Sequence, residues 1–105
     1  MSEERIMLVT VGSREEAERL ADALVGERLA ACVNIVGPIR SIYRWQGEVC
    51  RDDEHLLLIK TTRQQCESLE RRVCELHSYD VPEVIVLPIE SGSAAYLTWL
   101  REQVG

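Results

Sequence analysis

The chain has 105 residues, 46% of them hydrophobic, and a formal net charge of −6, a size at which one domain can bury its own core. The acidic charge disfavours a nucleic-acid backbone or an anionic membrane surface as partner, and no apolar run approaches the roughly 20 residues that span a bilayer. The four cysteines lack CxxC spacing and the first residues lack an apolar signal core, so we expect a single cytoplasmic domain over residues 1–105 that keeps its thiols reduced and binds neither nucleic acid nor membrane.

The first quarter of the chain predicts a strand followed by a helix. Residues 6–11 form a short apolar run that is typical of a central strand. Ser13 and Glu16 have the spacing of a capping box, in which each side chain bonds the other residue's backbone N–H. Apolar residues then recur at helical spacing up to Gly26, which suits the position just after a helix.

Residues 29–62 have the pattern of one very long β-hairpin. Apolar residues alternate along the outgoing strand, and Gln46 and Gly47 supply a tight turn before the return strand. The residues predicted to share one face are Leu29, Ala31, Val33, Ile35, Ile39, Tyr43 and Trp45. Each arm holds about 15 residues, against the usual 5 or 6, and spans roughly 50 Å.

The rest of the chain predicts a helix, a strand and a last helix. Thr62 and Gln65 indicate a second capping box, for a helix that ends near Ser78. A strand is expected over residues 83–87 and a final helix after residues 91–93. The order β, α, β, β, α, β with an added C-terminal helix predicts an α+β, ferredoxin-like sandwich, in which an antiparallel sheet carries the first two helices on one face.

The predicted hairpin is too long for its own domain. A first helix of about 13 residues is roughly 20 Å long and covers less than half of it, so residues 39–54 should project. A projecting ribbon with Ile39, Tyr43 and Trp45 exposed would aggregate unless another copy of the chain covers it. We therefore expect these three residues to anchor a closed oligomer. The alternative is a ribbon that folds back onto its own domain.

Five segments carry a resemblance to a known family. They are residues 28–34 (RLAACVN), 43–48 (YRWQGE), 59–62 (IKTT), 77–83 (HSYDVPE) and 96–100 (YLTWL). In this order they resemble the CutA family of divalent-cation tolerance proteins, over nearly the whole chain. The resemblance implies a ferredoxin-like fold, a homotrimer built through long hairpins, an architecture similar to that of the PII signalling proteins, and a link to copper and other divalent metals.

Candidate metal ligands are few. Cys74 and His77 lie three residues apart and can share a helix face, but they supply only two ligands, and a buried structural cysteine is the alternative. Where copper-binding members of the resembled family have a first-strand cysteine this sequence has Val9, and of their histidine pair only His77 remains. We expect no obligatory cofactor and weak binding of copper or another divalent metal at His77 and Cys74. His55 follows an acidic run at residues 52–54. Of its two interpretations, a weak surface site for a hard cation and a solvated charged patch, we favour the patch.

A second group of motif residues comprises Cys32, Lys60, Tyr79 and Glu83. By the resemblance these residues line a ligand cleft between subunits. A buried Lys60 ammonium would need a carboxylate or an anionic ligand. Two interpretations stay open: a ligand site, or a Lys60–Glu83 ion pair that closes the subunit interface.

Other functions on the same fold lack their motifs. The loop after the first strand has neither the CxxC of a metal-transfer chaperone nor a full glycine-rich anion cradle, and the central strands lack the aromatics of an RNA-recognition module. Nothing places Cys32 and His77 as nucleophile and base, so we expect no enzyme. Two hypotheses remain. The first is a trimeric tolerance protein that binds and responds to divalent metal ions; the second is a PII-like sensor or scaffold that binds a small anionic ligand and reports to a protein partner.

Overall fold

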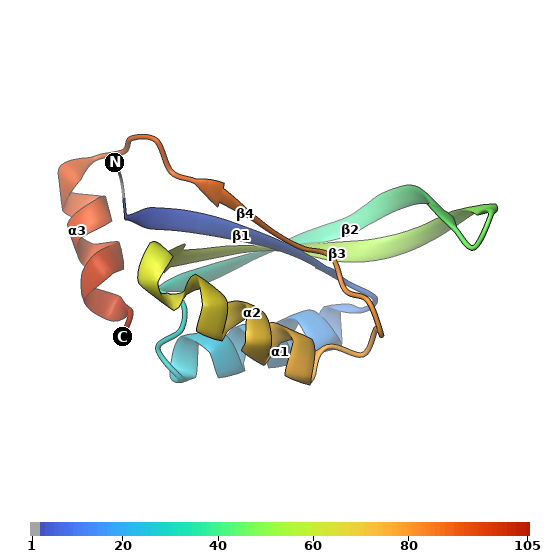
Figure 1. Cartoon of the computed structure of the whole chain (residues 1–105), viewed down its shortest axis with the longest axis horizontal. Coiled ribbons are helices and arrows are strands. Elements are labelled where there is room, and N and C mark those ends of the chain that lie inside the picture. Colours follow the sequence, from blue (N-terminus) through green and yellow to red (C-terminus); the bar gives the residue numbers. More distant parts are fainter. Residues whose placement is uncertain (1–2) are drawn as a thin grey trace.

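The computed structural model describes residues 3–105 and contains a four-stranded antiparallel sheet in the order β2-β3-β1-β4. The elements are β1 (Glu4–Val11), α1 (Arg14–Gly26), β2 (Cys32–Trp45), β3 (Glu48–Thr62), α2 (Cys66–Leu76), β4 (Val84–Pro88) and α3 (Ala94–Gln103). Helices α1 and α2 lie side by side on one face of the sheet, and α3 lies across the end where β1 begins (Figure 1). This architecture confirms the predicted α+β, ferredoxin-like sandwich with its long hairpin and added C-terminal helix. No helix within residues 3–105 is long and apolar enough to span a membrane.

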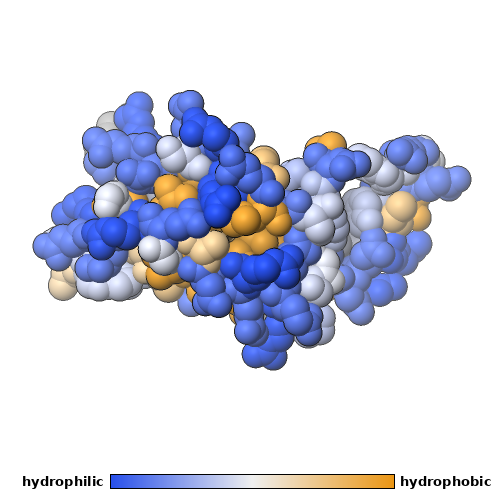
Figure 2. Space-filling model, turned by 90° about the horizontal axis from the view of Figure 1, so that it is seen from below, coloured by the Kyte–Doolittle hydropathy of each residue, from blue (hydrophilic) through white to orange (hydrophobic). Residues whose placement is uncertain are grey.

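The hydrophobic core lies between the sheet and the helices α1 and α2. Alternate β1 residues Met7, Val9 and Val11 are fully buried, as expected where helices cover one face of a strand. They pack against buried side chains of β3, α1 and α2, namely Leu57, Ile59, Leu20, Leu24, Leu69 and Val73. Viewed from below, hydrophobic residues gather near the middle of the helix side and hydrophilic ones cover most of the rest (Figure 2). Each buried side chain of this size contributes about 1.5–3 kcal/mol, so this layer is the main source of stability.

The starts of α1 and α2 differ from their predicted capping. Ser13 accepts a hydrogen bond from the Glu16 N–H at 3.1 Å, as predicted. The Glu16 carboxylate, however, bonds Ser78 instead of completing the capping box. Thr62 makes no side-chain cap, and a 3-10 turn over Arg63–Gln65 leads into α2. The Arg63 N–H of this turn donates to the Glu3 carbonyl at 2.7 Å. The Glu16 carboxylate and the turn before α2 thus both have partners that are distant in the sequence, and local spacing does not predict them.

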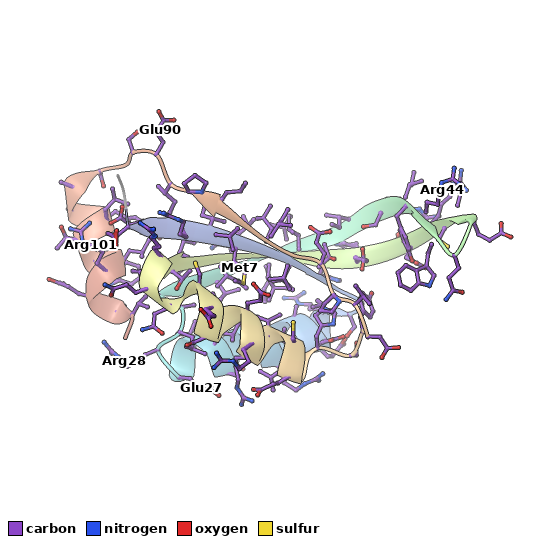
Figure 3. The ribbon with its side chains drawn as sticks, viewed as in Figure 1. Met7, Glu27, Arg28, Arg44, Glu90 and Arg101 are labelled. Atoms are coloured by element: carbon purple, nitrogen blue, oxygen red, sulfur yellow. The ribbon has the colours of Figure 1, made fainter. Side chains whose placement is uncertain are left out.

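The end of α1 also departs from its prediction. Gly26 remains helical, and the left-handed residue is Arg28, with φ of 62°. Arg28 donates from Nε to the Gly105 carbonyl at 2.8 Å, while the Gly105 N–H donates to the Arg28 carbonyl at 2.9 Å. These two bonds hold the end of the chain against the turn after α1, where Arg28 is labelled in Figure 3. They account for a non-glycine residue in a conformation that glycine usually takes.

The hairpin has an inner half that belongs to the sheet and an outer half that does not. β3 pairs with β1 from Thr62 to His55, whereas from Glu54 outward β2 and β3 pair only with each other. We call the outer part, residues 39–45 and 48–54, the ribbon. Gln46 and Gly47 close it with positive φ values of 51° and 81°, as in a type I′ turn. The ribbon projects beyond the helices (Figure 1), as the length mismatch predicted.

A bulge in β2 changes which residues share a face. Val36 pairs with Leu56 but Ile39 pairs with Glu54, so two residues of β2 oppose one of β3. One extra residue reverses the alternation of side chains along a strand. Ile39 and the odd-numbered residues after it therefore lie on the face of Glu54, opposite to Ile35. The prediction of one continuous apolar face from residue 29 to residue 45 is wrong for this reason.

The sheet face that is turned away from α1 and α2 also carries apolar side chains. By the strand registers, this face includes Ile6, Leu8, Leu56, Leu58, Ile85 and Leu87. We call it the open face. Ile85 and Leu87, on the edge strand β4, are 49% and 48% exposed. The open face and the ribbon together leave large apolar side chains accessible to solvent in a single chain.

Candidate functional site

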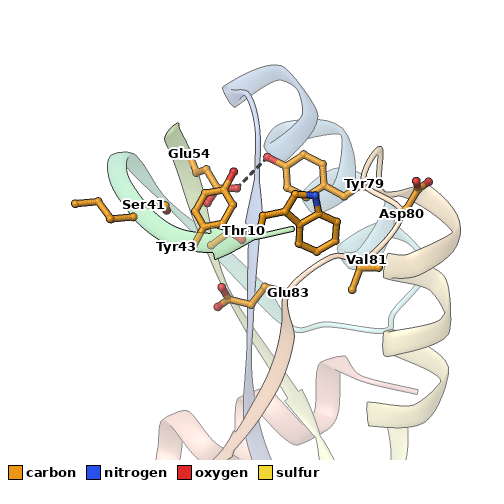
Figure 4. Close-up of a pocket in the computed structure, with 10 residues that line it drawn as sticks. Thr10, Ser41, Tyr43, Glu54, Tyr79, Asp80, Val81 and Glu83 are labelled. Atoms are coloured by element: carbon orange, nitrogen blue, oxygen red, sulfur yellow. Dashed lines mark hydrogen bonds between the residues drawn. The ribbon is translucent and has the colours of Figure 1, made fainter. Parts of the chain in front are cut away.

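A cavity lies at the base of the ribbon, where β1 ends and the connection between α2 and β4 passes (Figure 4). Its volume is about 590 Å³. The residues that line it are Thr10, Ser41, Ile42, Tyr43, Trp45, Glu54, Tyr79, Asp80, Val81 and Glu83. Three segments that are far apart in the sequence thus form one site, with ribbon aromatics facing the α2–β4 connection.

His77 holds the α2–β4 connection against β1. Its Nε2 lies 2.7 Å from the Thr10 carbonyl oxygen, and its Nδ1 lies 3.0 Å from the Tyr79 backbone nitrogen. A carbonyl oxygen accepts and a backbone N–H donates, so Nε2 carries the proton and Nδ1 accepts. The imidazole is buried. Both of its ring nitrogens are therefore already engaged by the backbone.

Glu16, in the first turn of α1, fixes the same connection from the other side. Its carboxylate accepts from the Ser78 N–H and from the Ser78 hydroxyl, each at 2.9 Å, and lies 3.6 Å from Nδ1 of His77. A negative charge is favourable at a helix N-terminus, and the two donors compensate the burial of the carboxylate. Sequence reasoning missed this role, because a glutamate at a capping position gives no signal of a partner 62 residues away.

Tyr79 closes the cavity against the ribbon. Its hydroxyl donates to Oε2 of Glu54 at 2.9 Å, and its ring centroid lies 4.7 Å from that of His77. Burial, and then the bond to Glu54, raise the pKa of Tyr79 well above its ordinary value, so the phenol keeps its proton and remains a donor. Glu54 is only 8% exposed. The interpretation of residues 52–54 as a solvated patch is wrong for Glu54, because Tyr79 and the ribbon cover it.

The charge of the cavity is negative. Glu54, Asp80 and Glu83 line it, and no lysine, arginine or histidine of the described chain does. These three carboxylates attract cations and repel small anions.

Tyr43, which also lines the cavity, has a raised pKa. Its hydroxyl donates to Asp52 on the ribbon, and this bond, more than burial, raises the pKa of Tyr43 to about 12.

The residues predicted to line a ligand cleft divide into two places within one chain. Tyr79 and Glu83 line the cavity. Cys32 and Lys60 are cross-strand neighbours on the open face, further along the sheet, where Lys60 also pairs in register with Ile6. Lys60 donates to the side-chain oxygen of Asn34. An ion pair between Lys60 and Glu83 does not form within residues 3–105.

The predicted interface residues all lie on the ribbon. Tyr43 and Trp45 line the cavity and are exposed, and Ile39 is half-buried at the start of the ribbon. Their aromatic rings are thus available to a ligand in the cavity as well as to a neighbouring chain. The expectation that they anchor an oligomer stays a prediction for the single chain.

The predicted metal ligands do not form a built metal centre in one chain. Cys74 is exposed, which rules out the alternative of a buried structural cysteine, whereas His77 is buried. A metal ion at His77 would have to replace a hydrogen bond to Thr10 or to Tyr79. Residues 3–105 contain no group of three or more His, Cys, Asp or Glu side chains placed to hold a metal ion. Copper therefore does not fit here as a resident group, and weak binding at His77 and Cys74 stays a prediction.

The chain is similar to known proteins over almost its whole length. Residues 5–103 match the family model described as CutA1 divalent ion tolerance protein. The divalent-cation tolerance protein CutA of Thermus thermophilus is 57% identical over 102 residues, which are 97% of this chain and 99% of that relative. Its solved structure has a TM-score of 0.95 and covers 97% of this chain and 99% of its own. The chloroplastic protein CutA of Arabidopsis thaliana is 52% identical over 91% of this chain, but the match covers 53% of that protein, so the chain spans about half its length.

Proposed function

The chain belongs to the CutA1 divalent ion tolerance protein family, and from this membership we propose that it is a homotrimeric divalent-cation tolerance protein of the cytoplasm. Relatives that are named for tolerance to divalent cations support the metal-tolerance part of the proposal. All four cysteines are free thiols, which fits a reducing compartment. The proposal includes no catalytic reaction.

The ribbon is the observation that carries the proposed assembly. Its strands pair only with each other beyond Glu54, and it exposes large apolar side chains such as Ile42. Free strand edges and apolar patches favour contact with another copy of the chain. The open face adds Ile85 and Leu87 to the accessible apolar surface. A ribbon of one chain on the sheet of the next is a head-to-tail contact, and such contacts form a closed ring when the rotation from one copy to the next returns to the first.

Light scattering after gel filtration tests the assembly. We expect a mass of about three chains of 12.0 kDa each, and dissociation of Ile85→Lys, because a lysine on the open face cannot be buried without a partner. Val25→Lys is the matched control, since Val25 is a 41% exposed valine on α1. A monomeric wild type, or two variants that both remain trimeric, would contradict the proposal.

A PII-like sensor is the second candidate, and Lys60 is the observation that favours it. Lys60 lies on the open face beside Cys32, and its side-chain partner is the uncharged Asn34. A neighbouring copy on the open face would bury this ammonium, which then requires a negative partner such as an anionic ligand. Thermal-shift assays with divalent metals, nucleotides and carboxylates separate the two candidates. Stabilisation by metals alone supports the tolerance protein; stabilisation by anions alone, lost in Lys60→Gln, supports the sensor.

A further inference from the structure

Lys60 has no negatively charged partner within its own chain. It is the only lysine of the sequence, and its ammonium group donates to the uncharged amide of Asn34. Among the described strand residues of the open face it is also the only basic one. An ammonium group that loses its water is strongly unfavourable unless an anion lies beside it. A neighbouring copy on the open face must therefore leave Lys60 in water or bring it a negative charge.

Glu54 has the complementary need for a positive charge. It is 8% exposed, its Oε2 accepts from the neutral hydroxyl of Tyr79, and it forms no ion pair within residues 3–105. A neutral donor compensates only part of the free energy that the burial of a carboxylate costs. Asp80 and Glu83 line the same cavity and add negative charge to it. The missing cation therefore has to come from outside the described chain.

The cavity beside Glu54 lies on the side of the ribbon that suits a neighbouring copy. The bulge places Glu54 on the same ribbon face as Tyr43 and Trp45, and large aromatic side chains of this kind are typical of interfaces. Figure 4 shows Glu54 bonded to Tyr79 at one side of the space and Glu83 at another. Its volume of about 590 Å³ in a single chain is room that a side chain of the next chain can enter. In an assembly through this face, the occupant of the cavity is therefore part of the neighbouring copy.

We propose that the Lys60 ammonium group of one chain enters this cavity on the neighbouring chain and pairs with the Glu54 carboxylate, which keeps its bond to Tyr79. The pairing rests on the proposed trimer, in which the ribbon of one chain lies on the open face of the next. Charge complementarity selects the two residues, because the open face offers one cation and the base of the ribbon offers one buried carboxylate.

Other basic side chains of the ribbon do not compete for the cavity. By the strand registers they lie on the ribbon face opposite to Glu54, and they are Arg40, Arg44 and Arg51. In a closed ring each chain gives its lysine to one neighbour and its glutamate to the other, so the same contact occurs at every interface. A Lys60 that is satisfied in this way needs no anionic ligand, so the pairing favours the tolerance protein over the sensor.

Cross-linking of the full chain with a water-soluble carbodiimide tests the pairing. The reagent activates a carboxylate, and an amine in contact with it displaces the activated group and forms an amide bond. Because Lys60 is the only lysine, a cross-linked peptide that contains it is assigned directly by mass spectrometry. Trimers refolded from an equal mixture of isotope-labelled and unlabelled chains separate the two cases: we expect peptides that join Lys60 of one isotope to Glu54 of the other. Lys60→Arg is the matched control, since it keeps the positive charge and the trimer but offers no amine, so the link should be lost.

Trimer dissociation on dilution gives a second measurement. Glu54→Gln and Lys60→Gln should each weaken the trimer roughly tenfold or more, because one charge of a buried pair is left without its partner. Glutamine can still accept the Tyr79 hydroxyl, so Glu54→Gln should fold. The double variant should lose less than the two single losses combined, since it leaves no unpaired charge. Glu90→Gln is the matched control, because this exposed glutamate lies in the β4–α3 connection away from the cavity (Figure 3).

The outcomes separate the pairing from the assembly on which it rests. A trimeric wild type whose Lys60 is linked only within its own chain, only to another carboxylate, or not at all overturns the pairing and leaves the trimer standing. Strictly additive losses in the two glutamine variants also overturn it, because residues in contact do not act independently. A monomeric wild type overturns the pairing and the trimer together.

Discussion

Tyr79 and Glu54 form a hydrogen bond of 2.9 Å that ties the α2–β4 connection to the base of the ribbon. The two residues are 25 positions apart, and the acceptor is a buried carboxylate. The same connection is held to β1 by His77 and to α1 by Glu16. One chain of polar contacts therefore holds this wall of the cavity in place and ties it to the base of the ribbon.

Tyr79→Phe should destabilise the protein. The change removes the only hydroxyl that donates to Glu54 within residues 3–105 and leaves the ring in place. Loss of a hydrogen bond to a buried charged group costs about 1–3 kcal/mol. Urea denaturation at one protein concentration measures it, because oligomers gain stability with concentration. Tyr96→Phe, on the surface of α3, serves as control. Identical midpoints for Tyr79→Phe and wild type would refute a stabilising role for this bond.

The stability of the protein should fall at alkaline pH. The bond to Asp52 raises the pKa of Tyr43 in the folded chain to about 12, whereas an unfolded tyrosine titrates near 10. The folded state therefore keeps this proton up to a higher pH than the unfolded state does. The contribution of Tyr43 to the free energy of unfolding is complete below pH of about 10 and is lost as the pH rises toward about 12. Ultraviolet absorbance of tyrosinate follows the titration.

The alkaline titration has a pair of matched variants. Asp52→Ala should bring the titration of Tyr43 back toward its ordinary range, because the first cause of the raised pKa is removed. Asp53→Ala should leave it unchanged, since Asp53 pairs with Arg40 at 3.0 Å instead. If Asp52→Ala titrates like the wild type, the assigned cause is wrong.

Copper binding at His77 should be weak and should depend on that imidazole ring. A metal ion must displace the bond of Nδ1 to Tyr79 or that of Nε2 to Thr10, which offsets part of the binding free energy. Calorimetric titration with copper and with zinc should therefore show shallow isotherms that His77→Ala abolishes and Cys74→Ser weakens. His55→Ala controls for the other histidine of the chain. Equal isotherms for the wild type and His77→Ala would exclude a metal site at His77.

Local chemistry made part of this structure predictable. The cap at the start of α1 is a hydrogen bond between Ser13 and the backbone three residues later. The turn at the ribbon tip depends on the backbone angles of Gln46 and Gly47 themselves. The sequence around these residues was therefore enough to predict both features. Glu16 and Glu54 were misassigned because their partners lie far away in the sequence and both residue types are usually solvated. The cavity was only partly foreseen, through Tyr79 and Glu83, for the same reason.

The β2 bulge was missed although the sequence marks its place. Gly37 and Pro38 interrupt the alternating pattern, and inside a strand these two residue types are typical of a bulge. In the structure, the ring of His55 occupies the space beside Gly37, and two residues of β2 oppose that one residue of β3. The resulting reversal brings Tyr43 and Trp45 to the face of Glu54, where they line the cavity.

Gly37→Ala should test whether this contact sets the bulge. An added Cβ would lie 2.5 Å from Cδ2 and 2.8 Å from Cγ of His55, so the ring or the β2 backbone must move. Overpacking of this kind costs about 1–3 kcal/mol. Gly26→Ala is the matched control: its Cβ meets nothing within 4 Å, and alanine at the end of α1 should be neutral or stabilising by up to about 1 kcal/mol. Urea midpoints at equal protein concentration give both values.

A double-mutant cycle makes the assignment specific to His55. His55→Ala removes the ring that the new methyl group meets, so Gly37→Ala should cost much less in that background than in the wild type. Nδ1 of His55 is buried without a hydrogen-bond partner in residues 3–105, so the single His55→Ala change relieves one unfavourable group while it opens a cavity. Because the bulge aims the ribbon, Gly37→Ala should also reduce the fraction of trimer in gel filtration, and the second substitution should restore it. Strictly additive effects on stability would show that Gly37 acts through the backbone alone and not through its contact with His55.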